Sequence, residues 1–229
     1  PFHSRWRHFD AGGVDRWAAL ARSLDPGIGA ADKARLRVDL AVTSVLLDAG
    51  AGDRWRYRDP ETGQTYTRSE GLAVASFEVF RRGLFSSDGQ APLRADARAL
   101  AALAPEALAE GFQAGPDNPL LGLEQRAALL RRLAGALEAR PQVFGTDPPR
   151  IGHLYDHLAA RAQDGRLPAP AILDALLAGL AGIWPDRPRL DGVELGDVWR
   201  HPAIEAPDAT AGWVPFHKLS QWLAYSLVE

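Results

Sequence analysis

The stretch AADKARLRVDLAVTSVLLDAG at residues 30–50 carries a helical pattern over its whole length. Its apolar side chains recur three and four positions apart, which is the spacing of one face of an α-helix. They are Leu36, Leu40, Val42, Val45, Leu46 and Ala49. Gly50 follows the last of them, and glycine commonly ends helices. We therefore predict a long helix from Ala30 to Ala49.

The periodicity changes directly after this helix. Residues 54–58 (RWRYR) and 64–68 (QTYTR) alternate between two faces, and 59–63 (DPETG) is a turn sequence between them. The pattern predicts one β-hairpin over about residues 54–68, and we expect it to be the only regular β-structure. Ser69 is the expected N-cap of the helix that follows.

Prolines separate the other helical patterns, at positions between helices where proline is tolerated. The remaining predicted helices cover 15–24, 69–84, 92–103, 105–112, 121–139, 150–162, 169–182 and 214–229. The sequence thus predicts a mainly α fold in which residues 1–229 form a single multi-helix domain.

Composition excludes several classes of function. The 229 residues include no cysteine, so disulfides, thiolate nucleophiles and cysteine-ligated metals are excluded, and a reducing, cytoplasmic location is expected. The net charge of −3 argues against a nucleic-acid partner. No apolar run approaches the roughly 18 residues that span a bilayer, so no membrane partner is expected.

Two further expectations concern what the chain lacks. No Gly-rich phosphate loop, nucleophile elbow or dinucleotide fingerprint is present, and we expect no cofactor. Methionine is also absent, and the chain opens and ends abruptly at Pro1 and Glu229. We expect the chain to be a fragment of a longer protein, truncated at both ends. The sequence does not indicate an oligomeric state.

A loop rich in Pro, Gly and Asp covers residues 185–212 and contains DGVELGDVWRHP at 191–202. Long loops inside a domain are often functional. In one interpretation a carboxylate here, Asp197 above all, faces a pocket with Trp199 as an apolar wall. In the other, the loop is solvated and Trp199 anchors it to the core.

The segment WVPFHKLSQW at 213–222 places Lys218, Gln221 and Trp222 on one stripe of the last predicted helix, with His217 beside it. Lys218 is one of only two lysines in a chain that otherwise uses arginine, and lysine suits phosphate binding. The alternative is that this stripe is simply the solvated face of a terminal helix.

Two other clusters contain histidines. The opening HSRWRH at 3–8 alternates cationic and aromatic residues, which suits either anion binding, chiefly by His3 and Arg5, or a β-like edge with its rings turned inward. His153 and His157 lie one helical turn apart, as in zinc sites, but a third ligand is missing and we predict no metal.

Three stretches together resemble the uracil-catabolism protein 4 family: FHSRWRHFDAGGVDRW (2–17), LGDVWRHPA (195–203) and VPFHKLSQWLAYSLVE (214–229). The resemblance covers essentially the whole chain, and members of the family are longer at both ends. It implies a part in a ring-opening route of uracil breakdown in which uracil is first converted to its nucleotide.

A more distant similarity links the chain to the queuosine-salvage nucleosidases. The stretch YRDPETGQTYTRSEGLAVASFEVFRRGL (57–84) is similar to their hairpin and following helix, and FHKLSQWLAYSL (216–227) to a late motif. In the match to the late motif, Lys218 aligns with an Arg of those enzymes and Gln221 with a Gln. Tyr225 and Ser226 align with their Tyr-Ser pair. The similarity implies an all-helical fold of the helix-hairpin-helix glycosylase type. Phe216 stands where those enzymes have Asp, so the carboxylate must come from elsewhere.

These observations predict an enzyme of pyrimidine breakdown that hydrolyses an N-glycosidic bond of a ribosyl-urea-type, nucleotide-derived intermediate such as a phosphoribosyl-urea. A buried carboxylate stabilises the positive charge that develops on the sugar. Asp197 is the first candidate, followed by Glu70 and Asp191. His217 is expected to protonate the leaving nitrogen.

The remaining predicted site residues bind substrate. Lys218 and Arg5 are expected to hold a phosphate or a carbonyl oxygen, assisted by Gln221. Four tryptophans are expected to exclude water or stack on a planar group: Trp6, Trp55, Trp199 and Trp222. Two alternatives stay open: an amide or ureide hydrolase of the same pathway, and a non-catalytic protein that binds a metabolite or a partner. The enzyme hypothesis requires residues 3–8, 53–70, 191–201 and 213–222 to meet around one cavity.

Overall fold

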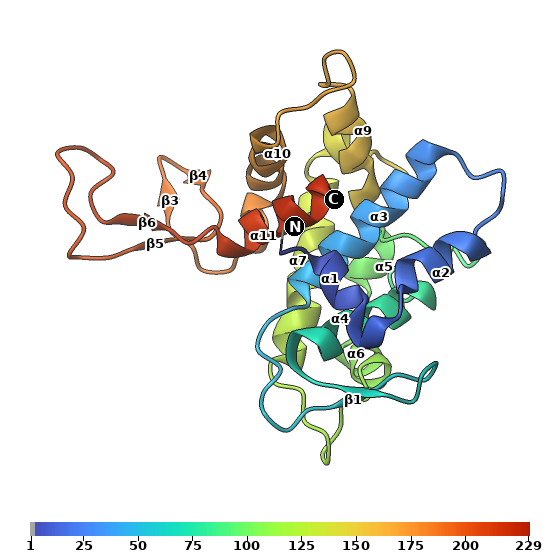
Figure 1. The fold of residues 1–229 in the computed structure, drawn as a ribbon. Helices are drawn as coiled ribbons and strands as arrows, with labels where there is room; N and C mark the ends of the chain where they lie inside the picture. The colour runs from blue at the N-terminus through green and yellow to red at the C-terminus, as the bar shows by residue number, and fades with distance from the viewer. Residues whose placement is uncertain (1–2) are drawn as a thin grey trace.

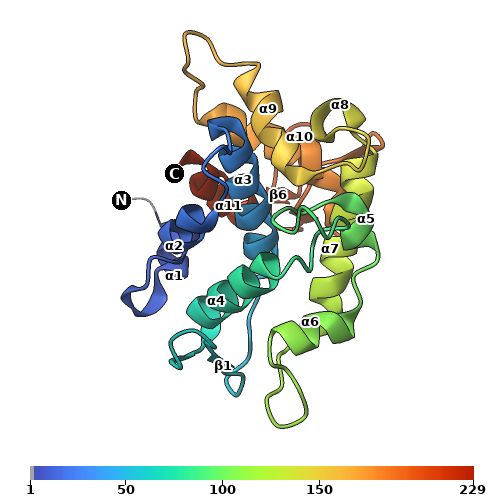
Figure 2. The ribbon, with the colours of Figure 1, turned by 90° about the vertical axis from the view of Figure 1, so that its right-hand side faces the viewer.

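Helix α3 (Ala30–Leu46) runs through the centre of the structure, a computed structural model that describes residues 3–229 (Figures 1 and 2). Every residue from Val38 to Leu46 is buried, because helices from both ends of the chain pack around this one. The helices in contact with it are α1 (Arg5–Phe9), α4 (Arg68–Arg81), α7 (Leu123–Glu138), α9 (Leu154–Ala159) and α11 (Lys218–Val228). The stretch that predicts the central helix therefore also forms the middle of the core.

The other helices complete a mainly α fold, as predicted. They are α2 (Arg16–Ser23), α5 (Ala97–Ala101), α6 (Pro105–Gly111), α8 (Pro141–Phe144) and α10 (Pro170–Leu180), with the 3-10 turns η1 (Ala11–Gly13), η2 (Ile151–His153) and η3 (Ala181–Ile183). Proline occupies the first turn of α6, α8 and α10, where its missing N–H costs no hydrogen bond. No helix within residues 3–229 is both long and apolar enough to cross a bilayer.

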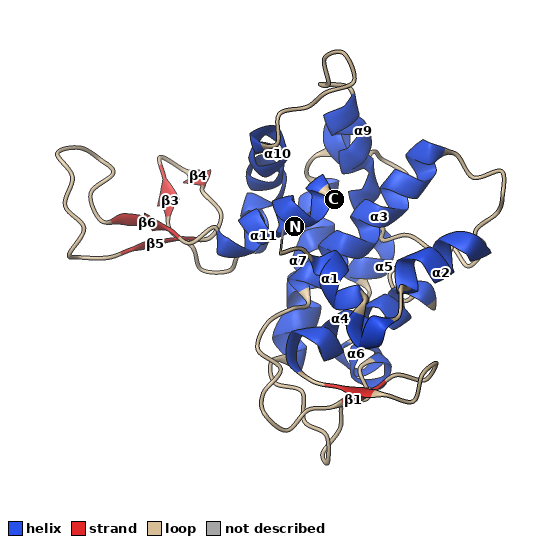
Figure 3. Ribbon diagram, viewed as in Figure 1, coloured by secondary structure: helices blue, strands red, loops and turns tan. Residues whose placement is uncertain are grey.

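The predicted hairpin is present as β1 (Tyr57–Arg58) and β2 (Thr65–Tyr66), paired antiparallel with Tyr57 opposite Tyr66. The expectation that it is the only regular β-structure is wrong. Strands β3 (Arg189–Leu190) and β4 (Val193–Glu194) form a second hairpin, and β5 (Val198–Arg200) and β6 (Trp213–Pro215) a third. Both belong to an arm that projects from the helical body, drawn at the left of Figure 3.

The turn of the second hairpin explains this error. Asp191 and Gly192 both have positive φ, 49° and 78°, which is the backbone of the tight turn that Asp-Gly favours between two strands. The dipeptide was therefore a hairpin signal inside a segment predicted as a loop. Formation of β6 also moves the start of the last helix from Val214 to Lys218.

Two local predictions at helix starts also need correction. Ser69 lies inside the first turn of α4, and Thr67 occupies the N-cap position without a side-chain capping bond. The opening segment forms helix α1 rather than a β-like edge, with Arg5 and Trp6 buried. The buried face of α1 packs on α3, α4 and α11, which brings the N-terminal segment next to the C-terminal helix.

Candidate functional site

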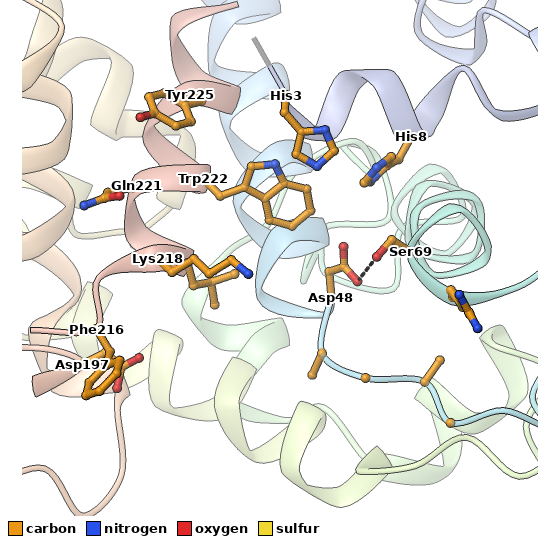
Figure 4. Close-up of a pocket in the computed structure, with 16 residues that line it drawn as sticks. His3, His8, Asp48, Ser69, Asp197, Phe216, Lys218, Gln221, Trp222 and Tyr225 are labelled. Atoms are coloured by element: carbon orange, nitrogen blue, oxygen red, sulfur yellow. Dashed lines mark hydrogen bonds between the residues drawn. The ribbon is translucent and has the colours of Figure 1, made fainter. Parts of the chain in front are cut away.

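A pocket of about 830 Å³ opens between α1, α4, α11 and the loop after α3 (Figure 4). This volume lies in the range of small-molecule sites. The residues that line it are His3, His8, Asp48, Ala49, Gly50, Ala51, Gly52, Arg68, Ser69, Asp197, Phe216, Lys218, Leu219, Gln221, Trp222 and Tyr225. The pocket thus collects side chains that are more than two hundred positions apart in the sequence.

Asp48 is the most buried carboxylate of the pocket, with 6 % of its side chain exposed. Its Oδ2 accepts a hydrogen bond from Arg5 Nη1 at 2.7 Å, and its Oδ1 accepts one from Ser69 Oγ at 3.1 Å. The carboxylate follows the C-terminal end of α3, where the helix dipole disfavours negative charge. The bonds from Arg5 and Ser69 compensate for this unfavourable position.

Arg5 lies behind the pocket and is completely buried. Besides Asp48, its guanidinium donates through Nε to Ser44 Oγ at 2.6 Å and through Nη1 to the Ser69 carbonyl at 3.3 Å. Its Nη2 has no hydrogen-bond partner within residues 3–229. Burial lowers the pKa of Arg5 to about 10, although the charge of Asp48 opposes this. Arg5 is therefore still cationic at neutral pH.

The loop that forms the pocket floor after α3 is fixed by a buried arginine of α7. Arg126 donates hydrogen bonds to the carbonyl oxygens of Leu47, Ala49 and Gly50, and the bonds to the last two are 3.1 and 3.0 Å long. These carbonyls have no partner within the helix, so Arg126 caps the C-terminal end of α3. The cap holds Asp48 in place against Arg5.

His3, His8 and Trp222 form an aromatic wall on one side of the pocket (Figure 4). The His3 ring stacks on Trp222 with centroids 5.9 Å apart, and the His8 ring lies 5.7 Å from the same indole. Burial, together with the positive charge of Arg5, lowers the pKa of His8. His8 is therefore a neutral imidazole at neutral pH.

The first residue of α11 and the base of the arm form another part of the lining. Lys218 extends toward the side of the pocket that holds Asp48, while Asp197 and Phe216 lie beyond it (Figure 4). Asp197 Oδ1 accepts a hydrogen bond from Arg187 Nε at 2.8 Å, and about a fifth of the side chain of each partner is exposed. Both carboxylates of the pocket thus have an arginine partner.

Four predicted site residues line this pocket: Asp197, Lys218, Gln221 and Trp222. The four segments expected to meet also contribute to it, through His3 and His8, Arg68 and Ser69, Asp197, and five residues of the last segment: Phe216, Lys218, Leu219, Gln221 and Trp222. The first segment, however, presents its histidines to the pocket and keeps Arg5 behind them.

Three predicted tryptophans lie outside the pocket lining. Trp55 is completely buried in the core, where its indole N–H donates to the Phe112 carbonyl at 3.0 Å. Trp6 is also buried and donates to the Ser226 carbonyl at 2.7 Å, which ties α1 to α11. Trp199 is 44 % exposed on β5, with the Arg187 guanidinium 4.1 Å from its ring centroid.

Three polar candidates also lie outside the lining. His217 precedes α11, and its ring lies next to Gly196 with a buried Nδ1 that has no partner within residues 3–229. Glu70 is exposed in the first turn of α4, and Asp191 is exposed in the turn of the arm. None of the three contributes a surface to the pocket described above.

One of the two histidines of the weak zinc signal, His153, has a backbone partner. His153 Nδ1 lies 2.8 Å from the Phe144 carbonyl, and Asp156, between the two histidines in sequence, pairs with Arg35 at 2.7 Å. Within residues 3–229, no three His, Asp or Glu side chains are grouped so as to hold a metal ion.

Sequence reasoning missed Asp48, His8 and Arg68 as pocket residues. A signal for Asp48 was present, because an aspartate directly after a long apolar helix is electrostatically unfavourable unless it has a partner. Its partner, Arg5, is 43 positions away in the sequence. No local pattern indicates that pairing.

Fold and site together define a helical domain with a pocket in which an arginine-paired carboxylate and an aromatic wall share the lining. The chain belongs to the family described as "Protein of unknown function (DUF1688)", whose model matches residues 1–229. It is 40 % identical over 230 residues to "Protein urg3" of Schizosaccharomyces pombe (strain 972 / ATCC 24843), covering 100 % of this chain and 53 % of that protein. It is 38 % identical over 239 residues to "Uracil catabolism protein 4" of Lachancea kluyveri, covering 100 % and 54 %. The chain thus spans about half the length of the curated relatives it matches.

Proposed function

We propose that this chain acts in uracil breakdown and that its pocket hydrolyses the N-glycosidic bond of a ribosyl-urea-type intermediate. The place in the pathway is supported by the name of the relative "Uracil catabolism protein 4". The reaction type is supported chiefly by one observation: Asp48, an almost fully buried carboxylate, borders the pocket while held by Arg5 and Ser69.

In this reaction the bond between the anomeric carbon and the urea nitrogen breaks, and its electron pair leaves with the nitrogen. Positive charge then develops on the sugar ring, and a carboxylate held nearby in a partly dry pocket stabilises that charge. Asp48 takes this role in our proposal, in place of Asp197. Water supplies hydroxide to the anomeric carbon and a proton to the nitrogen, so the products are the free sugar and urea.

His8 is our candidate for assisting the leaving group, in place of His217. Arg5 Nη1 lies 3.4 Å from His8 Nδ1, and a guanidinium can only donate. This contact favours the tautomer that carries its hydrogen on Nε2. A neutral imidazole with that hydrogen can donate to the ureide carbonyl as negative charge builds on the leaving group.

The aromatic wall suits the planar ureide. Trp222 presents an indole to the pocket, and stacking on planar groups is a common use of tryptophan in binding sites. The stacked pair of His3 and Trp222 extends this flat surface. Gln221, which also lines the pocket, offers both an amide donor and an amide acceptor.

The direct test is to incubate the purified protein with ribosyl-urea and with its 5′-phosphate, and to follow urea and the free sugar by mass spectrometry. We expect wild-type protein to release both products from at least one of these compounds. Asp48→Asn is expected to release little, whereas Asp53→Asn, a matched change at an exposed aspartate, should behave as wild type. If the protein binds either compound but releases no urea over hours, the hydrolase proposal is wrong and the chain is a metabolite-binding protein.

A further inference from the structure

Two carboxylates and two cations line the pocket, and the carboxylates are paired with arginines that lie outside the lining. Its two carboxylates, Asp48 and Asp197, are each matched by an arginine at 2.7 and 2.8 Å. Two further cations, Arg68 and Lys218, also line the pocket. Within residues 3–229 neither of them has an ion-pair or side-chain hydrogen-bond partner. Because Arg5 and Arg187, which lie outside the lining, neutralise the two carboxylates, the charges of Arg68 and Lys218 have no ion-pair partner in the described chain.

The two cations come from different elements that border the pocket. Lys218 begins α11, and Arg68 begins α4 with a φ of 51°, which is uncommon for a residue other than glycine. The N-cap residue of α4, Thr67, makes no side-chain capping bond, so N–H groups of the first turn are left for another acceptor. Arg5, by contrast, is committed to Asp48 and is completely buried.

We infer that the pocket binds the phosphorylated form of its substrate, a sugar phosphomonoester, and that Arg68 and Lys218 provide the charge that selects it. The phosphomonoester carries nearly two negative charges at neutral pH, which suits two lining cations that have no ion-pair partner in the described chain. The identity of the sugar rests on the proposed function, but the preference for a phosphate rests on the charges alone.

Isothermal titration tests this inference without any need for turnover. Ribose 5-phosphate, ribose and inorganic phosphate are compared as ligands at one fixed ionic strength. We expect ribose 5-phosphate to bind at least about tenfold more tightly than either of the other two, because a hydrogen bond to a charged group contributes about 1.5–3 kcal/mol. Equal binding of ribose and ribose 5-phosphate, or no binding of the latter, would overturn the inference.

Variants assign the effect to the two residues. Lys218→Gln and Arg68→Gln should each weaken binding of ribose 5-phosphate by about 10- to 100-fold and leave binding of ribose unchanged. The matched controls are Lys33→Gln, at the only other lysine, and Arg54→Gln, at an exposed arginine outside the pocket. If the controls weaken binding as much as the pocket variants do, Arg68 and Lys218 are not the recognition residues.

The two proposals fail in different ways. If ribose 5-phosphate binding depends on Arg68 and Lys218 but no urea is released, the hydrolase proposal fails and the phosphate site stands. If urea is released equally well from ribosyl-urea and from its 5′-phosphate, the hydrolase proposal stands and the preference for a phosphate fails.

Discussion

Two buried arginine–aspartate pairs involve α1, one through Arg5 within the helix and one through Arg16, which contacts its last residue, and they differ in how completely their polar atoms are hydrogen-bonded. Arg16 and Asp59 are 2.6 Å apart, and Arg5 and Asp48 are 2.7 Å apart. Arg16 also donates to the carbonyls of Phe9 and Ala11, both at 2.8 Å. Arg5, in contrast, leaves its Nη2 without a partner in the described chain, and Asp48 borders the pocket.

The pKa values of the two pairs reflect the same difference. Burial alone would lower the pKa of Arg16 and raise that of Asp59. Hydrogen bonds reverse both shifts, so the pKa of Arg16 ends above its ordinary value and that of Asp59 below it. For Arg5 burial prevails, and the pKa falls to about 10. The pair of Arg16 and Asp59 therefore has a structural role. In the pair of Arg5 and Asp48, the carboxylate borders the pocket, where a ligand can reach it.

The largest expected effect on stability comes from breaking the satisfied pair. Asp59→Asn removes the charge that compensates Arg16, and breaking a buried ion pair typically costs about 3–5 kcal/mol. We expect a loss of that size in the free energy of unfolding, measured by urea denaturation. Asp48→Asn also leaves the buried Arg5 without its ion-pair partner, but the loss should be smaller, because the change removes an unfavourable negative charge from the C-terminal end of α3 and Asp48 borders the pocket. Equal losses would show that the two pairs are alike.

The same two variants should reverse their order when activity is measured. We expect Asp48→Asn to lower kcat for urea release by about 10²- to 10³-fold, the size found when one preorganised electrostatic group is removed from an active site. Folded Asp59→Asn should keep wild-type kcat at a temperature well below its unfolding transition. A normal kcat for Asp48→Asn would remove Asp48 from the reaction.

A smaller effect is expected at Asp197, the other carboxylate of the pocket. Its pair with Arg187 is partly exposed, and such pairs contribute about 0–1 kcal/mol. Asp197→Asn should therefore lower kcat/KM by less than about tenfold. The measurement is the same urea assay, with Asp208→Asn as a control at an exposed aspartate of the arm. If Asp197→Asn lowers kcat/KM more than Asp48→Asn does, Asp197 is the catalytic carboxylate.

The features of the fold that have a local sequence signal could be predicted. Helical periodicity and prolines predict most helices, and the alternation around the DPETG turn predicts β1–β2, because each of these signals is local. The stripe of Lys218, Gln221 and Trp222 lines the pocket because an i, i+3, i+4 spacing already defines one helix face. The similarity to glycosylase-type helical folds stays a prediction.

What the sequence could not reveal depends on contacts between distant segments. Arg5 and Trp6 are adjacent to the histidines that reach the pocket, but the packing of α1 on α3 and α11 turns both inward. Trp55 is another residue that tertiary packing places in the core. The alternation of residues 54–58 fits a tryptophan buried in the core as well as one that contacts a ligand. Asp48 shows the opposite case, in which an unremarkable residue acquires its role from a partner elsewhere in the chain.

The smallest expected effect is a shift in the titration of His8, which lies beside the pocket pair. Burial and the charge of Arg5 hold the pKa of His8 below its ordinary value, while Asp48 opposes them. Replacing Asp48 by Asn removes that opposition, so the pKa of His8 should fall further. Its ring proton signal, followed by NMR against pH and assigned with His8→Gln, measures the shift.

The sign of this shift has a consequence for stability. Because the pKa of His8 is lower in the folded chain than the unfolded value of about 6.5, the unfolded chain binds more protons near pH 6. The contribution of His8 is therefore fully present above pH 6.5 and is lost as the pH falls through the folded pKa. Asp48→Asn should extend that loss to lower pH, whereas Asp59→Asn should leave the titration of His8 unchanged, because Asp59 is not among the charges that act on His8. A rise in the His8 pKa on Asp48→Asn would mean that Asp48 does not act on His8 through its charge, and the coupling of the pocket pair to His8 would have to be abandoned.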